Sequence, residues 1–274
     1  MTKLDMGRAW NDAVALIKAN RQLVAILAGV FFFLPNAIYT LAAPQPTELM
    51  QVLQNAEQPD EELVLQLGSA WLGETWWMIA IFLAVTLVGM LGLLSLFVDR
   101  DRPTVGEAIA AGAKATLPYI AAQLIVFAIN WALTLVLAGV GLLIHPALGA
   151  LMLAVAFALT IYISVRMVLV APIIVSDRTF NPLTALLQSL RMTSGNAVRL
   201  ALFYILLFVA VFVLIAVVGL VFSVFELMGE SIGLFANALG GSLVWATLMT
   251  VLVAVLAAIY RQLADRDVGG ETFA

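Results

Sequence analysis

The sequence predicts an all-α, polytopic membrane protein with six transmembrane helices, and three observations predict it. Of its 274 residues 64% are apolar and 11% are charged, with a mean hydropathy of +1.08, whereas a globular domain averages about 45–50% apolar and about 25% charged residues. Long uncharged intervals separate the charges, and the basic residues are confined to alternate connecting segments. The composition excludes a water-soluble domain.

Several kinds of chemistry are excluded by what the chain lacks. It has no cysteine and one histidine, so a disulfide framework, a thiol nucleophile, a thiolate metal site and an all-protein zinc or haem site are not expected. We therefore predict no catalytic residues, no metal site and no cofactor.

Uncharged intervals define the spans, because a helix needs about 20 apolar residues to cross about 30 Å of hydrocarbon. Four intervals hold one helix each. The fifth, between Lys114 and Arg166, contains 51 residues; this would be about 77 Å of helix at 1.5 Å per residue, so it must turn back, at His145-Pro146. The predicted spans are residues 22–42, 75–98, 117–143, 147–171, 199–224 and 236–260. A cleavable signal peptide is the alternative for the first, but its apolar run exceeds the roughly 7–15 residues of a signal core.

Orientation follows from the Lys and Arg residues, which accumulate in cytoplasmic loops. All 13 basic residues lie in the N-terminal segment, the 99–116 loop, the stretch 166–199 and the C-terminal tail. The 43–74 loop and the loop after span five carry acidic residues and no basic ones. Both termini are therefore predicted to be cytoplasmic.

A short amphipathic helix is predicted on the cytoplasmic side before each odd-numbered span. The first has an apolar stripe at helical spacing, made of Met6, Ala9, Trp10, Ala13 and Ile17. The second begins with a capping box of Thr104 and Glu107. The third begins at Asn181-Pro182 and ends at Gly195. We interpret these as three units of an amphipathic helix plus a hairpin, residues 1–98, 99–171 and 172–274, within one membrane domain, 1–274. A convergent need for interfacial helices is the alternative.

The outer loop, residues 43–74, holds two short helical patterns. Their apolar positions are Leu49, Val52 and Leu53 in the first and Leu63, Leu67, Ala70 and Trp71 in the second. We interpret the loop as a lid on the outer headgroups; a partner-docking surface is the alternative.

Arg166 is the most informative polar residue, because it lies inside span four, where an arginine costs about 2.5–3.5 kcal/mol on insertion scales. Three hypotheses explain it. It snorkels to the cytoplasmic interface, it hydrogen-bonds Gln123 or carbonyls freed near Pro172, or its guanidinium binds an anionic headgroup or substrate. If the third hypothesis holds, the variant Arg166→Gln is expected to lose bound anionic lipid and to fold nearly as the wild type does.

Two further patterns could carry a function. Gly229-Glu230-Ser231-Ile232-Gly233 matches a nucleophile elbow, with His145 predicted on the same side, but the elbow needs a strand before it and a later histidine. A flexible helix start is favoured. Asn36, Asn130 and Asn237 are candidates for a polar cavity within the membrane.

The stretch from Tyr162 to Arg199 resembles the signature of the bacterial inner-membrane proteins grouped as YciC-like, and of the membrane domain of some glycerophosphoryl diester phosphodiesterases. The residues that carry it are Arg166, Ala171-Pro172-Ile173-Ile174-Val175, Asn181 to Leu190, Met192-Thr193-Ser194-Gly195-Asn196 and Arg199. Asp177 stands where a glutamate is more usual. The resemblance implies an envelope-associated protein of the bacterial cytoplasmic membrane. It does not imply phosphodiesterase activity, which in the fused enzymes belongs to a separate soluble barrel.

The leading hypothesis is a non-enzymatic inner-membrane protein that binds anionic lipid or supports envelope assembly, its amphipathic helices forming a collar on the inner leaflet. Arg166, Gln123, Arg191 and Arg199 are the candidate lipid or anion ligands. The expected partners are the phospholipid bilayer, bound anionic lipid and other membrane proteins, with no nucleic acid. The alternative is a transporter or channel for a small or lipid-like substrate, with a path among the three hairpins.

Overall fold

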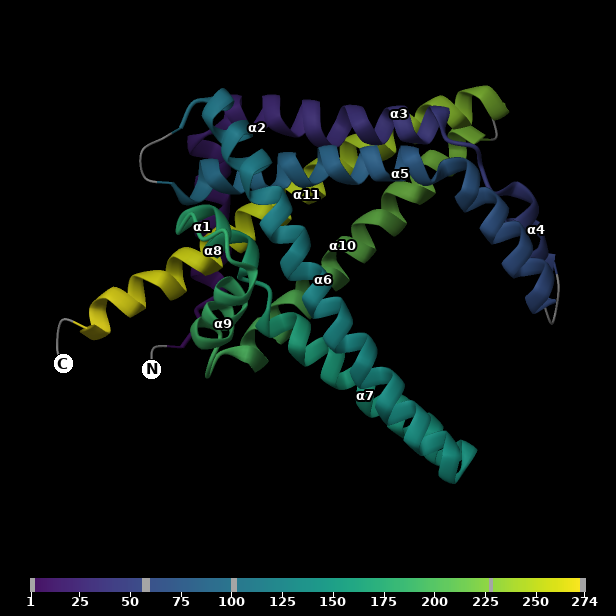
Figure 1. The fold of residues 1–274 in the computed structure, drawn as a ribbon. Helices are drawn as coiled ribbons and strands as arrows, with labels where there is room; N and C mark the ends of the chain where they lie inside the picture. The colour runs from purple at the N-terminus through teal and green to yellow at the C-terminus, as the bar shows by residue number, and fades with distance from the viewer. Residues whose placement is uncertain (1–2, 56–59, 100–102, 227–228, 272–274) are drawn as a thin grey trace.

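The structure, a computed structural model, describes residues 3–55, 60–99, 103–226 and 229–271. The regular elements in these ranges are all helical (Figure 1). They are α1 (Met6–Ala19), α2 (Arg21–Ala28), the π-helix η1 (Gly29–Phe33), α3 (Leu34–Ala42), α4 (Thr47–Asn55), α5 (Glu61–Val98), α6 (Val105–Ile144), α7 (Pro146–Arg166), α8 (Val170–Ser176), α9 (Pro182–Met192), α10 (Ala197–Glu226) and α11 (Glu230–Glu271).

Six helical stretches of the described residues are long and apolar enough to cross a membrane, which confirms the predicted fold class. They are Arg21–Ala42, Glu61–Val98, Val105–Ile144, Pro146–Ser176, Ala197–Phe225 and Ser231–Ala264. The predicted turn is also confirmed: His145 is extended, with φ −164° and ψ 140°, and Pro146 begins α7.

Two helices predicted to be short and separate are instead continuous with the spans that follow them. The Thr104–Glu107 capping box is present, but the helix it starts runs on through Pro118 as α6. The second pattern of the outer loop is likewise the first part of α5. Within a membrane a break leaves backbone groups unpaired, so a continuous helix is favoured even across a proline.

Span four, by contrast, is divided into two helices within the stretch Pro146–Ser176. α7 stops at Arg166, and residues 167–169 turn before α8 begins at Val170. The cause is Pro172, because a proline has no N–H and its ring clashes with the carbonyl four residues earlier, here that of Val168. The predicted span, residues 147–171, therefore lies within the observed stretch, which a turn at residues 167–169 divides.

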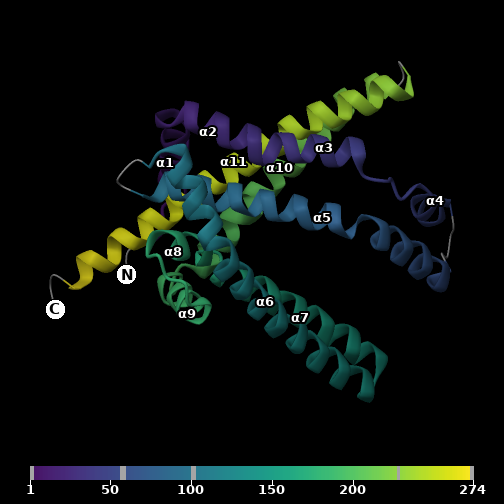
Figure 2. The ribbon, with the colours of Figure 1, turned by 45° about the horizontal axis from the view of Figure 1, so that its top comes forward.

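The chain ends, α1, α8 and α9 gather at one end of the molecule, and α4 lies at the other (Figures 1 and 2). We call the first the basic end, because α1, α7, α9 and the first turns of α6 and α10 bring basic residues there; the described ones include Arg8, Lys18, Lys114, Arg166, Arg191 and Arg199. Both termini lie on this side, as an even number of spans requires.

The buried core sits near the basic end. It is built from the last turns of α5, from α8 and from the middle of α11, with Ala9 and Ala13 of α1 packed on α11. In their most hydrophobic stretches, α5 and α11 have 56% of residues buried, whereas α10 has 6%. Exposed apolar surface on this scale does not occur on a soluble monomer, so the outer faces of α6, α7 and α10 are suited to lipid.

Candidate functional site

Arg166, the last residue of α7, holds the end of α9. Its Nε donates to Oγ1 of Thr193 over 2.9 Å, its Nη1 donates to the Tyr162 hydroxyl over 2.9 Å, and its Nη2 donates to the carbonyl oxygen of Leu190. Its guanidinium carbon lies 5.7 Å from the centroid of the Tyr162 ring, within cation–π range. Because the last carbonyls of a helix have no partner within it, Arg166 acts as a C-terminal cap for α9.

The end of α9 in turn satisfies the end of α7. Ser189 Oγ donates to the carbonyl oxygen of Arg166 over 2.8 Å, and Thr193 Oγ1 lies 3.2 Å from the same oxygen. Both hydroxyl-bearing residues are fully buried. The two helix ends therefore cap each other, which compensates for the backbone bonds lost in the turn at residues 167–169.

Two more polar residues tie neighbouring segments to this region. Asp177, after α8, accepts hydrogen bonds from Gln188 Nε2 at 2.6 Å and from the Tyr260 hydroxyl at 3.1 Å. Asn196 Oδ1, in the turn between α9 and α10, accepts the buried N–H of Leu4 at 2.9 Å. Together Arg166, Asp177, Ser189, Thr193 and Asn196 form what we call the junction, which connects α7, α8, α9, α11 and the N-terminal segment.

Gln123 is not a partner of Arg166 in the part of the chain that the structure describes. Its amide donates to the Tyr119 hydroxyl over 2.6 Å. Both side chains line an inner pocket of about 250 Å³, together with Ser164 and Met167. The hypothesis that Gln123 or carbonyls near Pro172 hold Arg166 is thus wrong, because α9, not α6, reaches the guanidinium.

The surface of α9 beside the junction is amphipathic. Ala185, Leu186 and Ser189 are buried against the protein, whereas Phe180 and Leu183 are 57% exposed and Leu187 is 56% exposed. A spacing of four residues places Leu183 and Leu187 on one edge of the helix, and Phe180 is exposed just before its N-cap; we call these three side chains the α9 edge.

Basic residues border the α9 edge. Arg191, in the last turn of α9, and Arg178, just before the helix, are exposed, and Arg199 is half-buried in the first turn of α10. Arg191 and Arg199 thus stand on either side of the 193–196 turn, where the junction lies.

Asn36 and Asn237 both line a cavity at the end of the spans opposite to the basic end, which we call the outer cavity. Its volume is about 320 Å³, and α3, α10 and α11 form its walls. Asn36 Nδ2 donates to Ser242 Oγ over 3.0 Å. Asn130 lies elsewhere, on α6, where its Oδ1 is buried and accepts no hydrogen bond from the described residues.

The elements that carry Ser231 and His145 do not meet. Ser231 is in the first turn of α11 and follows helix α10 rather than a strand, and His145 caps α7 by accepting the Ala147 N–H on Nδ1 over 3.1 Å. In both views the tip of the α6–α7 hairpin, where His145 lies, is remote from the tip of α10 and α11 (Figures 1 and 2). This arrangement provides no Ser–His pair.

Sequence reasoning missed that the junction is a mutual cap. It singled out Arg166 by its cost in the membrane, but Ser189 and Thr193 entered only through a resemblance. Their bonds to Arg166 join residues 23 and 27 positions apart, a relation that periodicity along one helix cannot show.

Among the described residues no group of three or more His, Cys, Asp or Glu side chains is placed to hold a metal ion. Comparison of the chain with protein-family models, with curated proteins and with solved structures gives no match. The candidate sites are therefore the junction with the α9 edge beside it, the inner pocket and the outer cavity.

Proposed function

We propose that the chain is a non-enzymatic protein of a bacterial cytoplasmic membrane, of the YciC-like kind, whose basic end faces the cytoplasm and binds anionic lipid. The observation that carries this proposal is the α9 edge. Phe180, Leu183 and Leu187 are exposed beside Arg178 and Arg191, at the end where the spans terminate. An exposed apolar edge bordered by cations is suited to the boundary between headgroups and acyl chains of an anionic leaflet.

Charge balance supports the same proposal. Asp177, the carboxylate nearest to α9 in the sequence, accepts hydrogen bonds from Gln188 and Tyr260. Each Lys or Arg near an anionic surface contributes about 1 kcal/mol to membrane binding. The junction fixes α9 against the spans, so the α9 edge keeps a constant position relative to the ends of the spans.

The proposed collar differs from the one expected from the sequence. At the basic end, α1 and α9 are the separate amphipathic helices among the described residues, since the second predicted helix is part of α6. Helix α1 packs Ala9 and Ala13 against α11 and leaves Trp10 exposed. The bilayer contact therefore rests mainly on α9, with Trp10 as a second anchor.

Native mass spectrometry of the full chain, released from vesicles of equal phosphatidylglycerol and phosphatidylcholine, tests the proposal. We expect phosphatidylglycerol to be retained preferentially, and the double variant Arg178→Gln/Arg191→Gln to lose most of that preference. Arg8→Gln is a control for loss of a basic residue away from the α9 edge, because Arg8 lies on α1 and its charge is compensated by Asp12 at 3.7 Å. Equal retention of the two lipids by the wild type, or an unchanged preference in the double variant, would overturn the proposal.

The alternative is a transporter or channel, for which a continuous polar path is needed. The inner pocket and the outer cavity share no lining residue. This separation favours lipid binding over transport.

A further inference from the structure

The outer cavity owes its polar wall to an interruption of the first span. Helix α2 passes into the π-helix η1 before α3 begins with Leu34-Pro35. A single-turn π-helix is often found at a functional position, and Pro35 supplies no N–H. Asn36 follows directly and points its side chain toward α11, where its amide donates to Ser242 Oγ over 3.0 Å.

Hydrogen bonds hold both the side chain and the backbone carbonyl of Asn36. Ser242 Oγ, having accepted from Asn36, donates to the Ala238 carbonyl oxygen, and Thr40 Oγ1 donates to the Asn36 carbonyl oxygen over 2.8 Å. Asn36 Oδ1 accepts no hydrogen bond from any described residue, although the side chain is half-buried and lines the cavity. Because this unpaired acceptor faces a cavity whose walls are mostly apolar, a ligand that donates a hydrogen bond is favoured there.

Among the described residues, no charged side chain lines this cavity. Its polar residues are Asn36, Thr40, Asn237 and Trp245, and the remainder are apolar or glycine. Because burying a charge without a partner is costly, the group that fits is an uncharged donor such as a hydroxyl.

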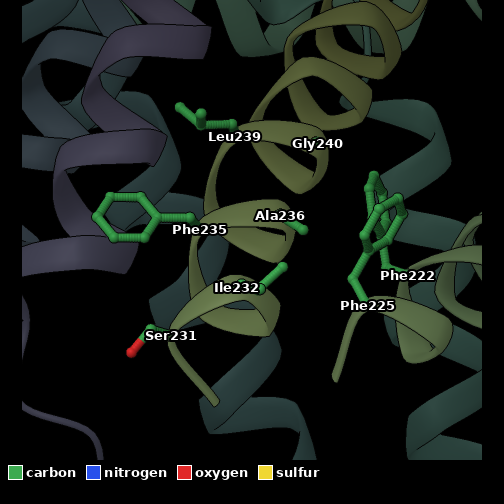
Figure 3. Close-up of a pocket in the computed structure, with 8 residues that line it drawn as sticks. All are labelled: Phe222, Phe225, Ser231, Ile232, Phe235, Ala236, Leu239 and Gly240. Carbon is green, nitrogen blue, oxygen red and sulfur yellow. The ribbon is translucent and has the colours of Figure 1, made fainter. Parts of the chain in front are cut away.

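An apolar hollow of about 540 Å³ adjoins the cavity, and Phe222 lines both. Figure 3 shows the rings of Phe222 and Phe225 on one side of the first turns of α11, and the side chains of Ile232 and Ala236 point toward these rings. Phe235 and Leu239 extend from the other side of the helix. A Cβ added at Gly240 would lie 1.9 Å from Phe222 Cζ, so the glycine lets this ring lie against α11. The hollow offers almost only carbon to an occupant and suits an alkyl or isoprenoid chain.

We propose that the outer ends of α3, α10 and α11 bind an uncharged lipid alcohol, its hydroxyl donating to Asn36 Oδ1 and its chain lying along Phe222. Two sources share this chemistry, a diacylglycerol and a long-chain isoprenoid alcohol. The site lies at the opposite end of the spans from the α9 edge, so it does not depend on the proposed function.

The experiment measures retention of dioctanoylglycerol, and separately of farnesol, by the full chain in native mass spectrometry. Each probe is compared with its acetate, which keeps the chain but has no hydroxyl to donate. We expect the alcohol to bind about tenfold more tightly than its acetate, the factor that about 1.4 kcal/mol gives. Preference for one of the two alcohols identifies the chain type.

Two variants test the location. Asn36→Ala removes the acceptor, and Gly219→Leu fills the cavity, since Gly219 lines it with nothing within 4 Å of an added Cβ; each is expected to lower retention of the alcohol about tenfold. Gly219→Leu leaves the Asn36–Ser242 bond in place, so it separates site loss from misfolding. Gly139→Leu is the control, because Gly139 is equally open on α6. Three results would overturn the proposal: equal binding of the alcohol and its acetate, occupation of the outer cavity by bulk phospholipid only, or unchanged retention of the alcohol in Gly219→Leu.

Discussion

Arg166 Nε and Thr193 Oγ1 lie 2.9 Å apart, in a pair of helix ends that satisfy each other. The Thr193 hydroxyl accepts from the guanidinium, and the Ser189 carbonyl oxygen lies 2.8 Å away as the nearest acceptor for its proton. An arginine near the membrane edge is thus accounted for by protein groups rather than by snorkelling. Its role is to position α9, and anion binding at Arg166 itself stays a prediction.

Replacing Arg166 should destabilise the protein, contrary to the expectation from sequence alone. Arg166→Lys keeps the charge, but one nitrogen cannot reach Thr193, Leu190 and Tyr162 together. Buried acceptors left without donors cost about 1–3 kcal/mol. Thermal unfolding in detergent should show a lower midpoint, and amide exchange in α9 should speed up. Arg191→Lys serves as the control, because Arg191 is exposed in the last turn of α9. Equal unfolding midpoints for the two variants would contradict the capping role of Arg166.

Thr193→Val tests the hydroxyl with little change of volume. The variant leaves Arg166 Nε and the carbonyls at the two helix ends without this partner, so a loss of about 1–3 kcal/mol in unfolding free energy is expected. Thr184→Val is the matched control on the same helix, because Thr184 is exposed and should change stability by less than about 0.5 kcal/mol. Denaturant unfolding followed by circular dichroism distinguishes the two. A Thr193 variant as stable as the Thr184 variant would refute the junction.

The close approach of α5 and α6 depends on Gly112. A Cβ there would lie 2.5 Å from the Val88 carbonyl oxygen and 2.6 Å from the Gly92 nitrogen, both backbone atoms that cannot move aside. Gly112→Ala should therefore cost about 1–3 kcal/mol through overpacking.

Gly139→Ala, on the same helix, is the matched control for this substitution. With nothing within 4 Å of the added methyl group, it should be neutral or stabilising, since alanine favours a helix by about 1 kcal/mol over glycine. Unfolding midpoints measured side by side decide the matter, and a Gly112 variant as stable as the Gly139 variant would show that the two helices are not so close.

The sequence predicted most of the fold because membrane spans are dictated by uninterrupted apolar length. The turn at His145 and the caps at Thr104 and Asn181 are local signals and were found where expected. The break before Pro172 is also a local feature. However, Pro118 lies inside the continuous helix α6, so a proline alone does not determine where a span breaks, and packing against other helices decides it. The junction and the outer cavity join residues from different helices, so neither could be derived from spacing along one segment.

The proposed lipid binding depends above all on the basic end facing the cytoplasm, and single-cysteine labelling tests this orientation most directly. The chain has no cysteine of its own, so each introduced thiol reports one site. E48C on α4, E61C at the start of α5, and R191C on α9 replace residues that are exposed. In intact bacterial cells, a membrane-impermeant maleimide should label E48C and E61C but should label R191C only after the membrane is permeabilised. Labelling of R191C in intact cells, or of all three positions from one side, would contradict the account.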